Sequence, residues 1–159
     1  MKQLWAPWRS AYIDSPKDGP CVFCRDEKQD QKASLILFSG AFSSVMLNKY
    51  PYNNAHLLLS PIRHAAGLVD LNIEESIDIL RLLRHCTTAL TKAVNPDGFN
   101  IGMNLGSAAG AGIADHLHMH IVPRWNGDTN FMPVLTDVKV MPAHLEETFD
   151  LLKPFFERI

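Results

Sequence analysis

The sequence contains no long apolar run, and none of its segments approaches the roughly 20 apolar residues that a bilayer-spanning helix requires. It also lacks an excess of one charge, because 15 Lys and Arg stand against 17 Asp and Glu in 159 residues. Without a basic surplus the chain has no field to hold a nucleic-acid backbone, so DNA and RNA are not expected partners. The first residues include Trp5, Pro7, Trp8 and Arg9, where a secretory signal needs an apolar stretch. We therefore expect a soluble, cytoplasmic protein with no membrane partner.

Cysteine is scarce, and the three present divide into a pair and a single residue. Cys21 and Cys24 form a Cys-x-x-Cys motif, which in a cytosolic chain indicates metal or redox chemistry rather than a structural disulfide. A redox motif would follow a strand, whereas residues 16–20 form a turn, so a zinc knuckle is favoured. Two thiolates need two further ligands for a closed tetrahedral site. A metal-free cysteine pair is the alternative, and Cys86 is predicted to pack on a helix face.

Three histidines alternate with apolar residues in the most informative segment of the chain. His116, His118 and His120 are separated by Leu117 and Met119, a pattern typical of a strand with two unlike faces. On one strand the three imidazoles would project from the same face, each about 6–7 Å from the next. Imidazole acts near neutral pH as a nucleophile, an acid or base, or a metal ligand. The segment therefore indicates chemistry, and a merely polar strand face is the alternative.

A loop rich in small residues precedes the histidines. It runs over residues 104–113 and contains Gly106, Gly110 and Gly112. Small residues let backbone N–H groups approach an anion closely, although most such loops are only turns. Because this loop leads directly into the histidine segment, we expect it to hold phosphate against a nucleophile.

Hydrophobic patterns predict an α+β fold with an antiparallel sheet. Strands are expected at 35–38, 42–47, 56–62, 99–103 and 117–123. Residues 1–33 are expected to be irregular, and a single domain over 1–159 is long enough to bury a core. A terminal helix is predicted to open at Pro142, with Leu145, Phe149 and Leu152 on one face, and to kink or end at Pro154.

A long helix is predicted to begin at Ile73. Asn72 is a suitable N-cap with Glu75 three residues later, and Asn95 with Pro96 ends the run. A buried stripe is expected at three-or-four spacing: Ile73, Ile77, Leu80, Leu83, Cys86, Leu90 and Val94.

Three stretches together resemble the histidine triad (HIT) superfamily, and most closely its bacterial diadenosine-tetraphosphate phosphorylase type. They are residues 4–13, the triad segment 115–124, and residues 123–131. The resemblance spans roughly residues 4–150. It implies a HIT-like antiparallel sheet of about five strands with one long and one C-terminal helix. It also implies homodimers or higher homo-oligomers.

The resemblance implies catalytic roles for two of the histidines. His118 corresponds to the nucleophile that forms a nucleotidyl-histidine, and His120 to the group that assists the leaving oxygen. In zinc-bearing relatives the cysteine pair is joined by an earlier-strand histidine and by the first triad histidine. The implied metal ligands are Cys21, Cys24, His56 and His116. The other histidines, His64, His85 and His144, together with Arg63, show no pattern and are expected to be solvated.

The resemblance also implies positions for the nucleotide. Asn48, eight residues before His56, corresponds to a ribose-binding residue. Met46 and Leu58 correspond to base contacts, with ordinary core packing as their alternative. The remaining predicted substrate-binding residues are Asn104, Gly110, Ala111, Gly112 and Trp125. Relatives often carry Gln, Ser or Thr near Gly112, whereas this chain continues with Ile113, so backbone groups or Ser107 would have to contact the phosphate.

The implied function is an enzyme that cleaves dinucleoside polyphosphates such as diadenosine tetraphosphate, with inorganic phosphate as the second-step acceptor. Arg124 or Arg9 would hold that phosphate, and Trp5, Trp8 and Trp125 would stack on a second base or seal a subunit interface. The same site could use water, as a nucleotide hydrolase or nucleoside phosphoramidase, and the triad alone does not separate these activities. A non-catalytic nucleotide sensor is a third possibility, which the intact His118 and His120 disfavour.

Overall fold

The structure is a computed structural model that describes residues 21–24, 30–129, 143–157 and 159. The predictions for Trp5, Trp8 and Arg9, and the predicted helix start at Pro142, lie outside these residues. The prediction of one domain over 1–159 stays a prediction for the same reason.

Five strands form one sheet in the order β1-β2-β3-β5-β4, and every neighbouring pair is antiparallel. Their bounds are β1 Ile36–Ser39, β2 Ser43–Leu47, β3 Leu57–Pro61, β4 Gly98–Met103 and β5 Met119–Arg124. The predicted α+β sheet is confirmed. The largest difference is at β5, which begins at Met119, so His116 and His118 lie just before the strand and do not extend an even ladder from His120.

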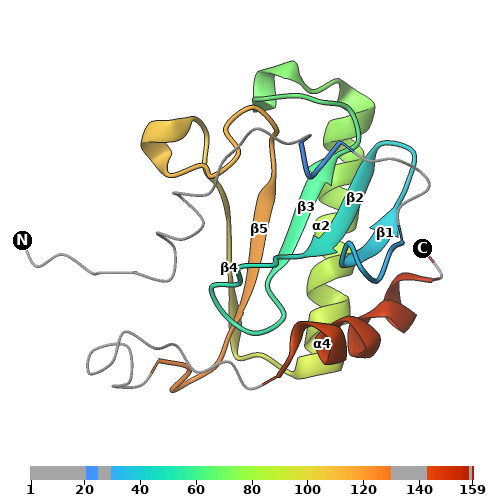
Figure 1. Ribbon diagram of the computed structural model, residues 1–159, viewed down its shortest axis with the longest axis vertical. Helices are drawn as coiled ribbons and strands as arrows, with labels where there is room; N and C mark the ends of the chain where they lie inside the picture. Colours follow the sequence, from blue (N-terminus) through green and yellow to red (C-terminus); the bar gives the residue numbers. More distant parts are fainter. Residues whose placement is uncertain (1–20, 25–29, 130–142, 158) are drawn as a thin grey trace, which may run out of the picture.

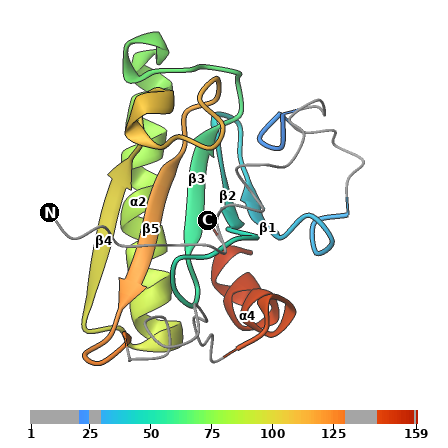
Figure 2. The same cartoon turned by 60° about the vertical axis from the view of Figure 1, so that its left-hand side comes forward.

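Within the described residues two α-helices accompany the sheet, α2 over Ile73–Val94 and α4 over Leu145–Leu152. Figures 1 and 2 show α2 running along one face of the sheet, with α4 near one end of the strands. Short 3-10 turns occupy Leu68–Asp70, Ser107–Ala109 and Lys153–Phe156. As predicted, the terminal helix ends just before Pro154, which cannot continue its hydrogen bonding. None of the described helices has the length and apolar character needed to cross a membrane.

The two faces of the sheet carry different side chains. The face against α2 belongs to a core that contains Met119, at 9% exposure, and six strand residues that are at most 1% exposed: Leu37, Val45, Leu47, Leu57, Leu59 and Ile121. The opposite face is set by the register, which aligns Met46 with Leu58 and Leu58 with His120. Because side chains alternate along strands, one face builds the core and the other is left for a site.

The predicted capping of α2 is confirmed. Asn72 accepts from the Glu75 N–H at 2.8 Å, and Glu75 accepts from the Asn72 N–H at 2.9 Å. At the other end Asn95 adopts the left-handed conformation with φ 44°. The helix therefore begins and ends where the sequence predicts.

The predicted buried stripe is wrong in the first half of α2. Ile73, Ile77 and Leu80 are 72%, 61% and 60% exposed. The helix instead turns a different set toward the sheet: Ile79, Leu82, Cys86, Ala89 and Leu90. Apolar residues lie on both sides of the first turns, so spacing alone did not fix which side faces the core. Cys86 is fully buried, as predicted, and burial raises the pKa of its thiol to about 12.

Candidate active site and metal centre

A cavity of about 400 Å³ lies over the open face of the sheet. Its floor includes Met46, Leu58 and His120, which share one row of the register. The loop of Cys21–Cys24, the residues just before β1 and the glycine loop before β5 also line it. The fold thus brings residues from distant parts of the sequence around His118 and His120.

Several predicted substrate residues line this cavity: Met46, Asn48, Leu58, Gly110 and Gly112. Ala111 is buried and is not among the lining residues, while Asn104 donates to the Gly110 carbonyl at 3.4 Å and so supports the loop. Sequence analysis missed other lining residues, which carry no motif of their own: Val22, Phe23, Leu35, Lys49, Tyr50 and Tyr52.

Trp125 lies away from the cavity. Its indole N–H donates to the carbonyl oxygens of Val94 and Asn95, both at 3.2 Å, at the C-terminal end of α2. Helix C-termini leave carbonyl groups without intrahelical partners. The structure therefore places Trp125 at the end of α2 and not at this cavity, and its role as a substrate contact stays a prediction.

The loop over residues 104–113, which was predicted to hold phosphate, offers fewer backbone N–H donors than expected. The N–H of Gly110 donates to Ser107 and that of Ala111 to Gly106, so both are used within the loop. Gly110 has φ 84°, a left-handed conformation that favours glycine over residues with a Cβ. Of the three predicted donors, only the Gly112 N–H has no backbone partner among the described residues.

The hydrogen bond of His118 to the backbone fixes which of its ring nitrogens carries the proton. Its side chain is 7% exposed and lines the cavity. Its Nδ1–H donates to the His116 carbonyl oxygen at 2.8 Å, and because a carbonyl only accepts, the proton sits on Nδ1. Nε2 therefore carries the lone pair. Burial lowers the pKa of His118, so the ring is neutral near pH 7.

In His120 the proton lies on the other ring nitrogen, Nε2, because of the hydrogen bond with His56. The Tyr52 N–H donates to Nδ1 of His56 at 3.0 Å, and the Asn48 amide donates to the same atom at 3.3 Å. Neutral His56 consequently carries its proton on Nε2 and donates it to Nδ1 of His120 at 3.0 Å. Neutral His120 then carries its proton on Nε2. The site holds a lone pair at His118 and a proton at His120.

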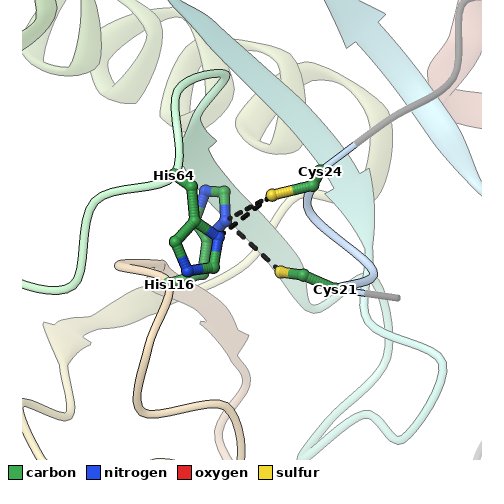
Figure 3. A group of neighbouring side chains, drawn as sticks. All are labelled: Cys21, Cys24, His64 and His116. Carbon is green, nitrogen blue, oxygen red and sulfur yellow. Dashed lines mark hydrogen bonds between the residues drawn. The ribbon is translucent and has the colours of Figure 1, made fainter. Parts of the chain in front are cut away.

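A second group of side chains gathers at the edge of the cavity (Figure 3). Cys21, Cys24, His64 and His116 each offer one ligand atom, and all four atoms lie within 4.8 Å of one another. Nδ1 of His116 is 3.4 Å from Sγ of Cys21 and 3.5 Å from Sγ of Cys24. Nδ1 of His64 is 3.0 Å from Sγ of Cys24. Two thiolates and two imidazoles at these separations fit a closed tetrahedral zinc site.

The structure corrects the prediction of His56 as a metal ligand. His56 precedes β3 and bonds to His120, whereas His64 follows β3 and joins the cysteine pair. The antiparallel register explains the difference: β3 pairs Leu59 with Met119, so the chain leaving β3 runs beside the residues that precede β5. Leu117 accordingly donates to the Ala65 carbonyl at 2.7 Å. His64, predicted to be solvated, therefore lies beside His116.

His116 is prepared for a metal by its other nitrogen. Its Nε2–H donates to the Pro61 carbonyl oxygen at 3.0 Å, which leaves the lone pair on Nδ1, the atom that faces the sulfurs. Metal-binding histidines usually donate their second N–H in this way, and the bond fixes ring orientation and tautomer. The donor set of this group therefore matches a metal centre in chemistry as well as in distance.

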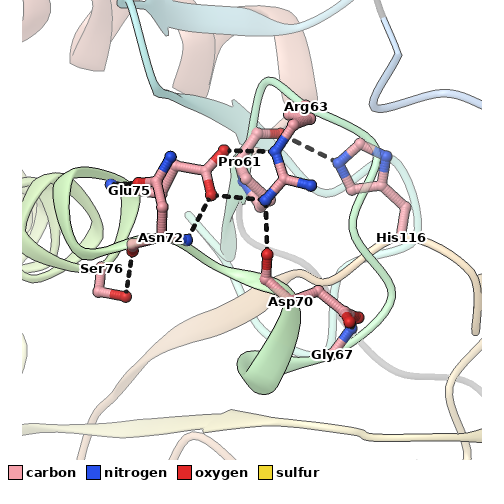
Figure 4. A network of polar contacts seen from close by, with 8 residues as sticks. All are labelled: Pro61, Arg63, Gly67, Asp70, Asn72, Glu75, Ser76 and His116. Carbon is pink, nitrogen blue, oxygen red and sulfur yellow. Dashed lines mark hydrogen bonds and ion pairs between the residues drawn. The ribbon is translucent and has the colours of Figure 1, made fainter.

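The loop that carries His64 is anchored to the start of α2 (Figure 4). Arg63 donates to both carboxylate oxygens of Glu75, at 2.9 and 2.8 Å, and to the Asp70 carbonyl at 2.6 Å. The Glu75 side chain is only 4% exposed. The bond with Arg63 lowers the pKa of Glu75 against the opposing effect of burial. Arg63 was expected to be solvated, and the structure makes it the tie between helix and ligand loop.

The ring of Phe23 contacts both His118 at the cavity and His116 of the candidate metal group. Phe23 lies between Cys21 and Cys24 in sequence and is 1% exposed. Its ring stacks on His118 with centroids 4.8 Å apart and planes 25° apart, and lies 5.2 Å from His116. The cysteine loop therefore packs directly against His118 and also contributes Cys21 and Cys24 to the candidate metal group.

Comparison with known proteins agrees with this geometry. The HIT domain family model matches residues 29–127. An AP-4-A phosphorylase of Mycobacterium tuberculosis is 34% identical over 96% of this chain and 83% of its own. An adenosine 5'-monophosphoramidase of Schizosaccharomyces pombe is 35% identical over 67% of this chain and 75% of its own. A solved Zn-bound histidine triad family protein of Mycobacterium smegmatis superposes with TM-score 0.62 at 25% identity, covering 76% of this chain and 82% of that one.

Proposed function

The chain belongs to the histidine triad (HIT) family and is an enzyme of the nucleotide-processing kind found among its relatives, and on that premise we propose that it cleaves diadenosine tetraphosphate through a nucleotide bound covalently to His118. The observation that carries the proposal is the pair of tautomers in the cavity. Nε2 of His118 holds a lone pair, and Nε2 of His120 holds a proton.

In the first step, Nε2 of His118 forms a bond to the α-phosphorus and the bond from that phosphorus to the bridging oxygen breaks. His120 gives its Nε2 proton or a hydrogen bond to the departing oxygen, so that ATP leaves. Dividing the reaction this way replaces one difficult displacement by two easier ones. Charge that develops on the transferred phosphate meets the Gly112 N–H of the glycine loop.

In the second step, an oxygen of inorganic phosphate attacks the same phosphorus and the nitrogen–phosphorus bond breaks, which releases ADP. The similarity to the tuberculosis phosphorylase supports phosphate as the acceptor. Arg124 is not a ready phosphate ligand, because its Nε and Nη2 groups donate to Asp128 at 2.6 and 2.9 Å. Arg9 lies outside the described residues.

The nucleoside of the bound nucleotide is proposed to occupy the 400 Å³ cavity. Its apolar lining by Met46 and Leu58 suits a base, and Asn48 offers amide groups for the ribose. Asn48 already donates to His56 and accepts from the Tyr50 N–H at 2.9 Å, so its position is fixed before a ligand arrives.

Zinc is proposed as the occupant of the Cys21, Cys24, His64 and His116 group. When bound, the metal supplies structural cross-linking between the cysteine loop and the residues that precede β5. His116 then serves as a ligand while its carbonyl orients His118. A cytoplasmic location remains a prediction.

A water-using activity is the second candidate, favoured by the phosphoramidase of Schizosaccharomyces pombe. Both activities pass through the same nucleotidyl-histidine, and they differ only in the oxygen that attacks it.

Product analysis in heavy-oxygen water tests the proposal. Purified protein should convert diadenosine tetraphosphate to ADP and ATP when phosphate is present, with no solvent oxygen in the ADP. Phosphate-independent formation of AMP that carries solvent oxygen would establish the hydrolase instead. No cleavage under either condition would contradict the proposed substrate.

A further inference from the structure

A second hollow of about 230 Å³ lies next to the main cavity. It is lined by Tyr52, Asn53, Asn100, Val122 and Arg124, and Tyr52 lines the main cavity as well. The Tyr52 ring stacks on His120 with centroids 5.5 Å apart and planes 25° apart. Tyr52 and His120 therefore stand between the two hollows.

The two hollows lie on the same face of the sheet. His120, Val122 and Arg124 alternate along β5, and Asn100 of β4 pairs with Val122. Same-face neighbours on a strand are about 6–7 Å apart, so Val122 lies one such step beyond His120. A ligand that starts in the main cavity and passes over the histidines would next reach this hollow.

The second hollow combines an apolar wall at Val122 with polar side chains that are held in place and close to neutral as a group. Arg124 and Asp128 form a two-bonded ion pair, and Arg124 Nη1 also donates to the Asn100 amide oxygen at 2.6 Å. Asn53, 5% exposed, donates to Asp128 at 2.7 Å and to the Pro123 carbonyl at 3.1 Å. Paired charges attract an anion weakly, whereas hydroxyl and ring nitrogen groups can bond to amides and guanidinium.

Arg124 and Asn100 retain N–H groups that can donate to the hydroxyl or ring nitrogen groups of a ligand. Contacts with the described residues use three of the five guanidinium N–H groups of Arg124. The Asn100 side chain accepts through its oxygen, which leaves its amide nitrogen as a donor. A preformed wall of this kind binds without first having to be ordered.

From this placement we infer that the second hollow binds the distal nucleoside of a dinucleoside polyphosphate, the one that departs with the leaving group. The inference rests on the proposed function. One nucleoside occupies the main cavity, the phosphate chain crosses His118 and His120, and the other nucleoside sits against Asn100, Val122 and Arg124. Two-ended substrates thereby gain contacts that a mononucleotide cannot make.

Two substrates separate the hollows experimentally. Diadenosine tetraphosphate has a distal nucleoside, and adenosine 5'-phosphoramidate has none. Val122→Phe fills the second hollow, and Asn100→Ala removes a donor from its wall. Each variant should raise KM for the tetraphosphate by about tenfold, while kcat/KM for the phosphoramidate stays within about twofold of the parent. Val69→Phe, at a residue that is 95% exposed, and Asn126→Ala in the loop after β5 make the same chemical changes at residues that line neither hollow.

The outcomes are distinct. A selective loss on the tetraphosphate in Asn100→Ala supports the inference even if Val122→Phe, altered at a buried position, fails to fold. Unchanged kinetics in Asn100→Ala, or equal losses on both substrates, would overturn the inference and leave the proposed function intact. A parent protein that cleaves the phosphoramidate but not the tetraphosphate would overturn both.

Discussion

His118 and His120 are chemically identical side chains whose contacts place the proton on different ring nitrogens. The His116 carbonyl oxygen accepts a hydrogen bond from Nδ1–H of His118, so that proton stays on Nδ1. At His120 the proton lies on Nε2, because Nδ1 accepts from His56, whose own Nδ1 accepts from a backbone N–H. A histidine's role is therefore decided by what its second nitrogen meets. Sequence shows the histidines but not those partners.

Replacing His118 with alanine should abolish turnover, because no covalent intermediate can then form. We expect kcat to fall by more than about a thousandfold, as for other enzymes that lose a nucleophile. Steady-state assays with diadenosine tetraphosphate measure this. His85→Ala, which removes a histidine bonded to the Phe155 carbonyl, is the matched control and should keep its activity. Activity in His118→Ala within tenfold of the parent would refute the assignment.

His64 and His56 should respond differently to removal. His64→Ala should lower zinc content and thermal stability together, because a structural metal binds only the folded chain. His56→Ala should keep the metal and lose turnover, because His120 then loses the partner that orients it. Elemental analysis and thermal unfolding measure both effects. Equal zinc content in the two variants would contradict the assignment of ligands.

At the scale of elements, the segment that leaves β3 is held by contacts to His116 and to the start of α2. Pro61 accepts from His116, and Arg63 is bound to Glu75 at the start of α2. The Arg63–Glu75 ion pair thus links the cap of α2 to the segment that carries His64. Disturbing the cap should loosen the loop that carries His64.

Glu75→Gln tests this tie through its pH dependence. Because Arg63 lowers the pKa of Glu75 in the folded chain, the interaction stabilises the fold above the usual carboxyl pKa and is lost as the pH falls. We expect the variant to lower the free energy of unfolding by about 1–3 kcal/mol at pH 7. The difference should shrink as the pH falls below about 4.5, the usual range of a carboxyl group. Denaturant unfolding at several pH values measures it, with exposed Glu74→Gln as the control. A deficit that stays constant down to pH 3 would argue against the ion pair as its cause.

The sequence predicted elements better than contacts between them. Asn72 and Glu75 fixed the start of α2 because capping depends on residues three apart. The failures were long-range: Ile73, Ile77 and Leu80 had the spacing of a core stripe but lie on the other side of the helix. His64 carried no local signal, because its place beside His116 comes from the pairing of β3 with β5. The apolar periodicity of a helix shows that a face is present, but packing against the sheet decides which face is buried.

At the scale of the whole molecule, two features of the described residues offer surface for contact with a second subunit. β4 is an edge strand of the sheet, and the exposed apolar residues Ile73, Ile77 and Leu80 lie along α2. Unpaired sheet edges and apolar patches are common places for subunits to meet. Both features support the homodimer that the family resemblance implies.

The dimer prediction can be tested by sedimentation velocity. The parent should sediment as a dimer, and Ile77→Asp should shift the population toward monomer, because a charge would be buried at the contact. Asp78→Asn, which changes charge at the next residue of α2, is the control. A monomeric parent at micromolar concentration would exclude this assembly.

The burial of Cys86 has a practical consequence for following the metal centre. With no exposed surface and a pKa near 12, its thiol is almost never the reactive thiolate, so alkylating reagents should not label it in the native protein. Cys21 and Cys24 lie at the surface of the knuckle, where a bound metal would shield them. Mass spectrometry after brief alkylation should therefore add no label to the metal-loaded chain, two labels after chelation, and the third only on unfolding. The number of labelled cysteines therefore reports both metal occupancy and global unfolding, without an added probe.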